Sequence, residues 1–255
     1  MNGMLLALQF FTAIPVKKEL PLGRKEVTAM YVMLPFVGAA IGLVMYAVSV
    51  LMLDVVHVGP LLAAVFVLLA GIILTGGLHL DGWADTGDAF FSYRDRAKRL
   101  EILDDPRLGA FGTMALVLLI VVKIALFHEI LVRGGIGHLA LFIVIPFLAR
   151  AGLNVYFTTA PLAKDKGIAH FFKEKMAGNV IIGCSLAASV AVLVAVGLLM
   201  NSLLLPIGLF AVLAVALIVF RSWSLKHFGG VSGDLCGAFI EGTEALLWMT
   251  VLCFM

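Results

Sequence analysis

The sequence predicts an all-α protein: a polytopic membrane bundle of about six to seven transmembrane helices, forming one integral-membrane domain over residues 1–255. Hydrophobic residues make up 62% of the chain and charged residues only 13%, and the mean hydropathy is +1.12. Several apolar runs reach the roughly 20 residues that a helix needs to cross a lipid bilayer. The alternating ten-residue segments of a membrane barrel are missing from the sequence. Helices are therefore the expected spanning elements.

The predicted elements follow the hydropathy along the chain. Residues 4–14 are apolar but too short to span and are closed by a proline, which predicts an interfacial or re-entrant segment. A short amphipathic helix is expected at 94–104, and polar loops at 161–179 and 226–238. Seven crossings are expected, the last barely long enough, at residues 28–53, 60–79, 110–132, 138–158, 180–200, 203–222 and 239–255.

The basic residues lie on one side of this bundle. Fifteen of the eighteen Lys and Arg residues fall in the N-terminal segment or in the loops near 81–109, 160–179 and 221–227. Basic loops are typically cytoplasmic. We therefore expect a multi-pass protein of the cell inner (cytoplasmic) membrane, with an active site that faces the cytoplasm. The three scattered cysteines indicate neither a disulfide framework nor a zinc site. No nucleic-acid partner is indicated, and the pattern is compatible with a homo-oligomer.

An acidic stretch interrupts the apolar pattern. Seven of the sixteen acidic residues lie within residues 81–105. If the stretch begins as a helix, Asp81, Asp85 and Asp88 fall within an arc of about 60°. Three carboxylates on one face repel one another unless a cation lies between them, and oxygen ligands favour a hard ion such as Mg²⁺. The pattern predicts a metal site, and the alternative is a set of solvated loop charges.

Two glycines complicate the helical interpretation of this stretch. Gly82 and Gly87 would each weaken a helix by about 1 kcal/mol. Their lack of a side chain could instead let a bulky anionic substrate approach the backbone.

Other polar residues near this stretch have two interpretations each. His79 is either an interfacial histidine or a general base for a hydroxyl group. Arg107 is typical of a phosphate clamp, whereas the basic residues at 94–99 could simply mark the cytoplasmic side. The Gly-rich segment 232–237 could present N–H groups to phosphate, although it lacks the lysine of a P-loop.

Charged residues inside the predicted spans are costly in hydrocarbon. Lys123, Glu129 and Arg150 are therefore expected to face the bundle interior. Glu241 and Glu244 would be favourable charges near the start of the last helix, and Glu241 could also reach the site. The Met and Phe residues are interpreted as core or lipid-facing filler.

A juxtamembrane acidic metal site, a nearby arginine and a Gly-rich loop together indicate chemistry on a diphosphate. Metal ions neutralise phosphate charge while the protein positions the nucleophile. From the residues alone, the prediction is a membrane phosphotransferase or a diphosphate-using transferase.

Three motifs make the prediction more specific. They are H-L-D-G-W-A-D-T-G-D (His79 to Asp88), D-P-R-L-G-A-F-G (Asp105 to Gly112) and G-G-V-S-G-D-L-C-G-A-F-I-E (Gly229 to Glu241). With the opening F-F-T-A-I-P, they closely resemble the cobalamin synthase family, the adenosylcobinamide-GDP ribazoletransferases, over essentially the whole chain. The resemblance implies that adenosylcobinamide-GDP is joined to α-ribazole or its 5′-phosphate. GMP would be released, Mg²⁺ required, and adenosylcobalamin or its 5′-phosphate formed as the last nucleotide-loop assembly step.

Site roles follow from the resemblance and from the residues discussed above. The catalytic candidates are His79, Asp81 and Asp85, and the metal ligands are Asp81, Asp85 and Asp88. The substrate-binding candidates are Asp105, Arg107, Arg150, Ser232, Asp234 and Glu241.

Two alternatives are weighed against this prediction. A CDP-alcohol phosphotransferase of lipid synthesis also uses Asp pairs and Mg²⁺, but its D-G-x-x-A-R continuation is absent, because Asp85 follows D-G-W-A here. A transporter would account for the intramembrane charges, yet the densest polar chemistry lies in the loops rather than at the bilayer midplane.

Overall fold

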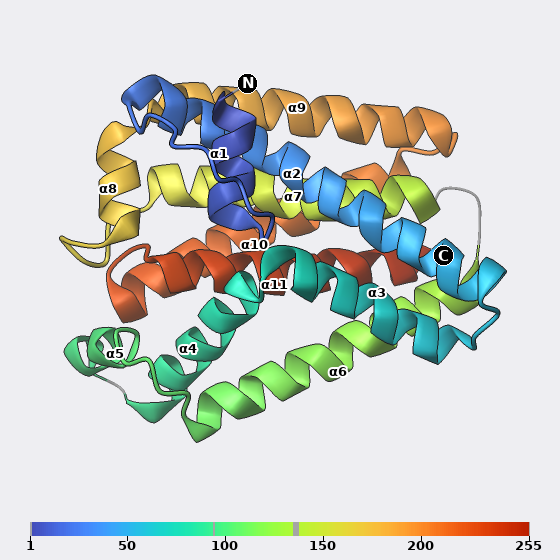
Figure 1. Ribbon diagram of the computed structural model, residues 1–255, viewed down its shortest axis with the longest axis horizontal. Helices are drawn as coiled ribbons and strands as arrows, with labels where there is room; N and C mark the ends of the chain where they lie inside the picture. The colour runs from blue at the N-terminus through green and yellow to red at the C-terminus, as the bar shows by residue number, and fades with distance from the viewer. Residues whose placement is uncertain (1, 94, 135–137, 255) are drawn as a thin grey trace.

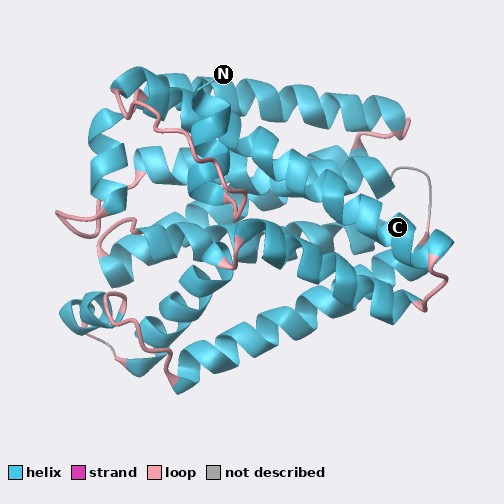
Figure 2. Cartoon of the chain, in the orientation of Figure 1, coloured by secondary structure: helices cyan, strands magenta, loops and turns pink. Residues whose placement is uncertain are grey.

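The computed structural model describes residues 2–93, 95–134 and 138–254, and it confirms the all-helical membrane bundle. Within these ranges the chain consists of helices joined by loops (Figure 2). The one extended pairing among the described residues is a bridge between Leu162 and Val231, which ties two loops together.

Six helices in the described part of the chain are long and apolar enough to cross a membrane. They are α2 (Arg24–Val50) with its π-helical end η1 (Leu51–Val55), α6 (Ala110–Arg133), α7 (His138–Thr159), α9 (Gly178–Leu199), α10 (Leu204–Phe228) and α11 (Gly233–Phe254). The shorter helices are α1 (Asn2–Phe11), α3 (Pro60–Thr75), α4 (Leu78–Ser92), α5 (Arg96–Ile102) and α8 (Ile168–Lys175).

The spanning helices run along the long axis of the molecule, with α7 inside the bundle (Figure 1). In the most apolar window of α7, 78% of the residues are buried, against 22% for α10 and 33% for α9. The outer helices instead expose large aliphatic side chains, such as Leu198 (73% exposed) and Ile218 (65%). Such a surface is expected to face lipid, so α7 forms the core and α9 and α10 the periphery.

The second predicted crossing, 60–79, corresponds to α3, which ends at Thr75, a few residues earlier than expected. The chain turns by 93° between α3 and α4. Gly76 and Gly77 have φ angles of +63° and +75° at this bend, a left-handed conformation that glycine adopts without steric cost. Hydropathy does not report the direction of a helix axis, so it could not predict the bend between α3 and α4. With α3 counted as one further crossing, the chain has the seven expected spans, and α5 lies on the same side as the N-terminal segment. Helix α4 is the polar arm beyond the bend.

Three other predicted boundaries also change. The predicted loop 161–179 contains α8, and α10 continues to Phe228 instead of ending near residue 222. The predicted loop 226–238 shrinks because α11 already begins at Gly233, which makes the last helix a full-length span. The predicted amphipathic helix 94–104 is present as α5, while Arg94 lies outside the described residues.

The charge bias makes the membrane topology testable. Figure 1 places α5, α8 and the start of α11 at one end of the bundle, and the turn between α9 and α10 at the other. Ala97→Cys and Ser202→Cys, each in a background without native cysteines, should therefore be labelled from opposite sides by an impermeant thiol reagent. Labelling of both from the same side would contradict an odd number of crossings between the two positions.

Candidate active site

Helix α4 carries the acidic motif, and two glycines let it pack closely against its neighbours. A Cβ atom added at Gly82 would lie 2.6 Å from the backbone oxygen of Asp234 on α11, and one at Gly87 would lie 2.7 Å from Ala115 on α6. These glycines therefore serve helix–helix contact. The expectation that they admit a bulky substrate to the backbone is wrong, since protein atoms occupy that space.

The three carboxylates of α4 have different surroundings. Asp81 is exposed and Asp85 is half-buried, whereas Asp88 is buried. Asp88 accepts a hydrogen bond of 3.2 Å from the backbone N–H of Gly112, in the first turn of α6. A carboxylate is favourable at a helix N-terminus, so Asp88 fixes the start of α6 against α4. Asp81 and Asp85 instead line a cavity beside α4.

Negative charge accumulates around Asp85. Burial raises the pKa of the Asp85 carboxyl to about 7, helped by the like charges of Asp81, Asp234 and Asp88. Within the described ranges, no group of three or more His, Cys, Asp or Glu side chains is already close enough together to hold a metal ion. Mg²⁺ commonly binds through one or two carboxylates together with water and substrate phosphates. The carboxylates of Asp81 and Asp85 therefore fit a cation that binds together with a phosphorylated substrate.

Asp81 lies between two cavities. The larger, of about 820 Å³, is also lined by Asp85 and by Pro106 of the loop before α6. The smaller, of about 260 Å³, is also lined by His79 and by Asp234 at the start of α11. A group bound at Asp81 is consequently accessible from two sides.

Arg107 lies in the loop beside the larger cavity. Its Nε and Nη2 atoms donate to the two carboxylate oxygens of Asp105, at 2.9 and 2.7 Å. These side-chain bonds, with the backbone N–H of Arg107, lower the pKa of Asp105 to about 2. The Arg107 side chain is 86% exposed, and exposed ion pairs contribute little to stability. A phosphate group could therefore replace Asp105 on this guanidinium.

The predicted phosphate-binding segment 232–237 is the start of α11 instead of a Gly-rich loop. The backbone N–H of Leu235 donates to Ser232 Oγ at 3.3 Å, as expected of a helix-capping serine. The Ser232 hydroxyl also lies 3.4 Å from the Asp234 carboxylate. Asp234 lies against Gly82 of α4 and lines the smaller cavity, whereas Ser232 caps α11 and does not line it.

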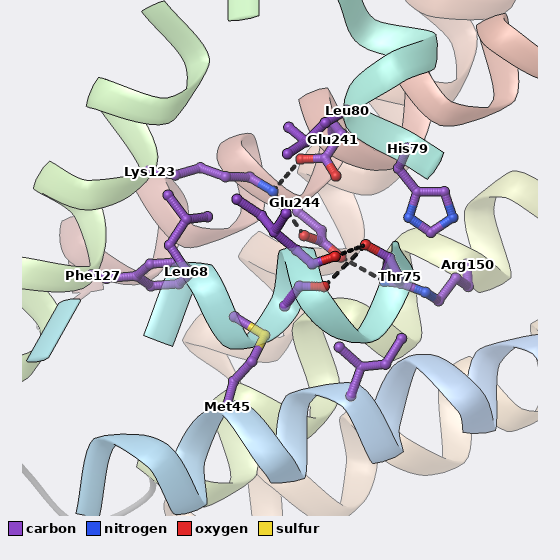
Figure 3. A pocket seen from close by; sticks show the side chains of 13 residues that line it. Met45, Leu68, Thr75, His79, Leu80, Lys123, Phe127, Arg150, Glu241 and Glu244 are labelled. Carbon is purple, nitrogen blue, oxygen red and sulfur yellow. Dashed lines mark hydrogen bonds and ion pairs between the residues drawn. The ribbon is translucent and has the colours of Figure 1, made fainter. Parts of the chain in front are cut away.

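Arg150 and Glu241 belong to a buried ionic network behind α4. Lys123 of α6 is bonded to Glu241 and, at 3.0 Å, to Glu244 on α11. Arg150 of α7 contacts Glu244 at 2.5 Å and donates to the Pro146 carbonyl at 3.0 Å. Figure 3 shows the two cations approaching the glutamates from opposite sides. The two glutamates lie well inside α11, so the expectation of simple N-terminal charges is wrong.

The expectations for the intramembrane charges are partly confirmed. Lys123 and Arg150 face the interior, with 4% and 2% of their surface exposed. Glu129 does not: its side chain is 48% exposed and lies 3.7 Å from Arg133, one turn further along α6.

His79 connects the network to the smaller cavity. It is 3% exposed, and neither ring nitrogen has a hydrogen-bond partner among the described residues. The residue lines the smaller cavity beside Asp81 and also a narrow space of about 30 Å³ shared with Arg150 and Glu244. A buried imidazole without partners is costly, and burial lowers the pKa of His79 to about 3, so the ring is neutral.

Aromatic residues form the part of the site that the sequence interpretation missed. Phe10, Tyr31, Phe157 and Phe172 line the smaller cavity and come from four different helices. The sequence interpretation treats the phenylalanines as filler, because nothing in the spacing of these four residues along the chain indicates that they meet.

Comparisons with known proteins agree with these motifs. Residues 3–252 match the family model described as cobalamin-5-phosphate synthase. A protein of Geobacillus thermodenitrificans named adenosylcobinamide-GDP ribazoletransferase is 38% identical over 254 residues, covering 98% of this chain and 95% of its own length. Proteins with the same name from Clostridioides difficile and Acinetobacter baumannii are each 33% identical, covering 100% and 98% of this chain and 99% and 96% of their own length. No solved structure matches the chain.

Proposed function

The chain belongs to the cobalamin-5-phosphate synthase family of membrane enzymes, and we propose that it joins adenosylcobinamide-GDP to α-ribazole or α-ribazole 5′-phosphate. The products would be GMP and adenosylcobalamin or its 5′-phosphate. The observation that carries this proposal is the position of Asp81 between two cavities, beside Asp85 and Asp234. A transferase needs such a junction, because its donor and acceptor must meet at one phosphorus atom.

The proposed reaction is an in-line displacement. The ribazole hydroxyl oxygen attacks the phosphorus attached to the corrinoid side chain and forms a new P–O bond. The P–O bond to the GMP portion breaks, and GMP leaves with the bonding electrons. His79 lines the cavity beside Asp81 and would orient the hydroxyl group. Because burial lowers the pKa of its imidazole to about 3, the hydroxyl proton would pass on to water instead of staying on the ring.

A divalent cation, Mg²⁺ in this proposal, fits the open carboxylates of this site. Asp81 and Asp85 would hold it, with Asp234 close enough to add negative charge. When bound, such an ion neutralises the diphosphate and stabilises the leaving oxygen. Asp88 was also predicted as a ligand; its bond to the start of α6 supports a positioning role in this proposal.

Arg107 is proposed to hold a phosphate of the donor. Arg107→Lys should lower kcat/KM for the donor at least tenfold, about 1.4 kcal/mol, because an ammonium cannot form the two parallel bonds of a guanidinium. Steady-state kinetics with adenosylcobinamide-GDP measure the effect. Arg24→Lys, an exposed substitution at the predicted cytoplasmic side, is the control and should stay within about threefold of wild type. Equal losses in the two variants would remove Arg107 from the donor site.

The reaction is tested by assaying nucleotide release from purified protein. GMP should appear only when adenosylcobinamide-GDP and α-ribazole are both present. If the protein releases CMP from a CDP-alcohol and no GMP from the corrinoid donor, the lipid-enzyme alternative is favoured. The transporter alternative has less support, because the intramembrane cations Lys123 and Arg150 are paired with glutamates.

The active site is proposed to face the cytoplasm, where the nucleotide-activated donor would be found. Helix α5 is basic, and it lies at the same end of the bundle as the loop between α5 and α6 (Figure 1). The positive-inside rule supports a cytoplasmic position for that end.

A further inference from the structure

The smaller cavity beside Asp81 has two chemically different parts. Most of its wall is apolar and aromatic, whereas one side carries His79, Asp81 and Asp234. A ligand that fits both parts has a flat apolar body joined to a polar group that bears hydroxyls.

The aromatic wall is held rigid by contacts among its own rings. Tyr31 and Phe157 are stacked, with ring centroids 5.1 Å apart and an interplanar angle of 17°. Phe10 and Phe172 meet edge to face at 5.0 Å, and Phe172 also contacts Tyr31 at 6.1 Å. Pairs of this kind stabilise one arrangement of the rings. The wall is therefore preorganised for another flat ring.

The sizes of the two cavities distinguish their ligands. Ligand pockets typically enclose about 300–1,000 Å³. The smaller cavity, at about 260 Å³, is suited to a compact group such as a nucleoside base and is too small for a macrocycle. The larger cavity, at about 820 Å³ and lined by Asp85, has room for the diphosphate portion of a large donor. Asp81 and Phe10 line both cavities, so the two ligands would meet there.

We infer that the aromatic cavity between α1, α2, α7, α8 and α11 binds the aromatic base of the acceptor nucleoside, with the ribose hydroxyl directed toward Asp81. The inference rests on the proposed function and assigns its two substrates to opposite sides of Asp81. This arrangement brings the nucleophile to one side of the reacting phosphorus while the leaving GMP occupies the other, as an in-line displacement requires.

Ala169 offers a direct test, because it lines the cavity from α8 and is only half-buried. Ala169→Phe should fill the cavity without removing an existing contact. The KM for α-ribazole should rise at least tenfold, while the KM for adenosylcobinamide-GDP stays within about threefold. An unchanged acceptor KM, or equal rises in both, would overturn the inference.

A second pair of variants separates aromatic contact from folding. Phe172→Leu keeps an apolar side chain in the wall but loses the ring, and should raise the acceptor KM about threefold to tenfold. Phe171→Leu on the same helix is the matched control, because Phe171 is absent from the cavity lining and is 36% exposed. It should leave both KM values unchanged. Equal effects of the two substitutions would contradict the assignment.

Binding to the wild-type protein supplies a readout that needs no turnover and no variant. Protein in lipid nanodiscs should bind α-ribazole in the absence of donor, and benzimidazole should compete while ribose should not. If ribose competes and benzimidazole does not, or if only added lipid displaces α-ribazole, the base site is elsewhere. If the wild type releases GMP and the Ala169→Phe variant has the same KM for α-ribazole as the wild type, this inference is overturned and the proposed function stands. Absence of corrinoid-dependent GMP release would overturn the proposed function.

Discussion

Asp81→Asn and Asp85→Asn should each lower kcat by about a thousandfold, about 4 kcal/mol of transition-state stabilisation. Both substitutions keep the shape of the side chain but remove a negative charge where the cation and diphosphate are proposed to bind. Asn remains an acceptable helix residue at an open position, so the protein should still insert and purify. The measurement is GMP release over a Mg²⁺ titration.

The control for these variants is Asp165→Asn, since Asp165 is an exposed carboxylate in the loop before α8. It should retain wild-type activity, because it lines neither cavity at Asp81. Full activity of Asp81→Asn or Asp85→Asn at any Mg²⁺ concentration would remove that residue from the metal site. A loss of the same size in Asp165→Asn would show that the assay responds to general charge instead.

Lys123→Met should destabilise the protein by at least about 3 kcal/mol. Lys123 is buried and bonded to Glu241 and Glu244, and its removal leaves two glutamates facing Arg150 alone. Removal of one partner from a buried ion pair typically costs about 3–5 kcal/mol, because the remaining charge has no compensation. Thermal unfolding in detergent, or unfolding by a denaturing detergent, measures the loss.

A matched lysine provides the control for the buried network. Lys98 also pairs with a glutamate, Glu101, but the two side chains are 55% and 69% exposed. Lys98→Met should therefore leave the unfolding midpoint nearly unchanged, because exposed ion pairs contribute little to stability. The double substitution Lys123→Met with Glu241→Gln should recover part of the loss by removing one uncompensated charge. Equal destabilisation by Lys98→Met and Lys123→Met would contradict the importance of burial.

The helical bundle could be predicted because lipid imposes a strong requirement on sequence. Long apolar runs revealed the spanning helices, and the spacing of Asp81, Asp85 and Asp88 revealed the acidic helix that the structure contains as α4. The 93° bend at Gly76 and Gly77 escaped prediction, since a glycine pair allows a left-handed turn without requiring one.

Residues of the candidate site could be predicted where they belong to short sequence motifs, as on α4 and at the start of α11. The α4 carboxylates belong to one short motif, whereas the contact of Lys123 with Glu244 joins residues 121 positions apart. The aromatic wall depends in the same way on rings from separate helices, such as Phe10 and Phe172. Such meetings depend on the packing of the bundle, which no local pattern specifies.

The central claim is that an acceptor hydroxyl displaces GMP from the corrinoid-bound phosphorus at Asp81. The most direct test uses α-ribazole labelled with ¹⁸O in the reacting hydroxyl, with product analysis by mass spectrometry. The account predicts that the label is retained in the phosphodiester of the corrinoid product and that the released GMP is unlabelled. Label in GMP, or loss of the label from the corrinoid product, would contradict attack by that oxygen on the corrinoid-bound phosphorus.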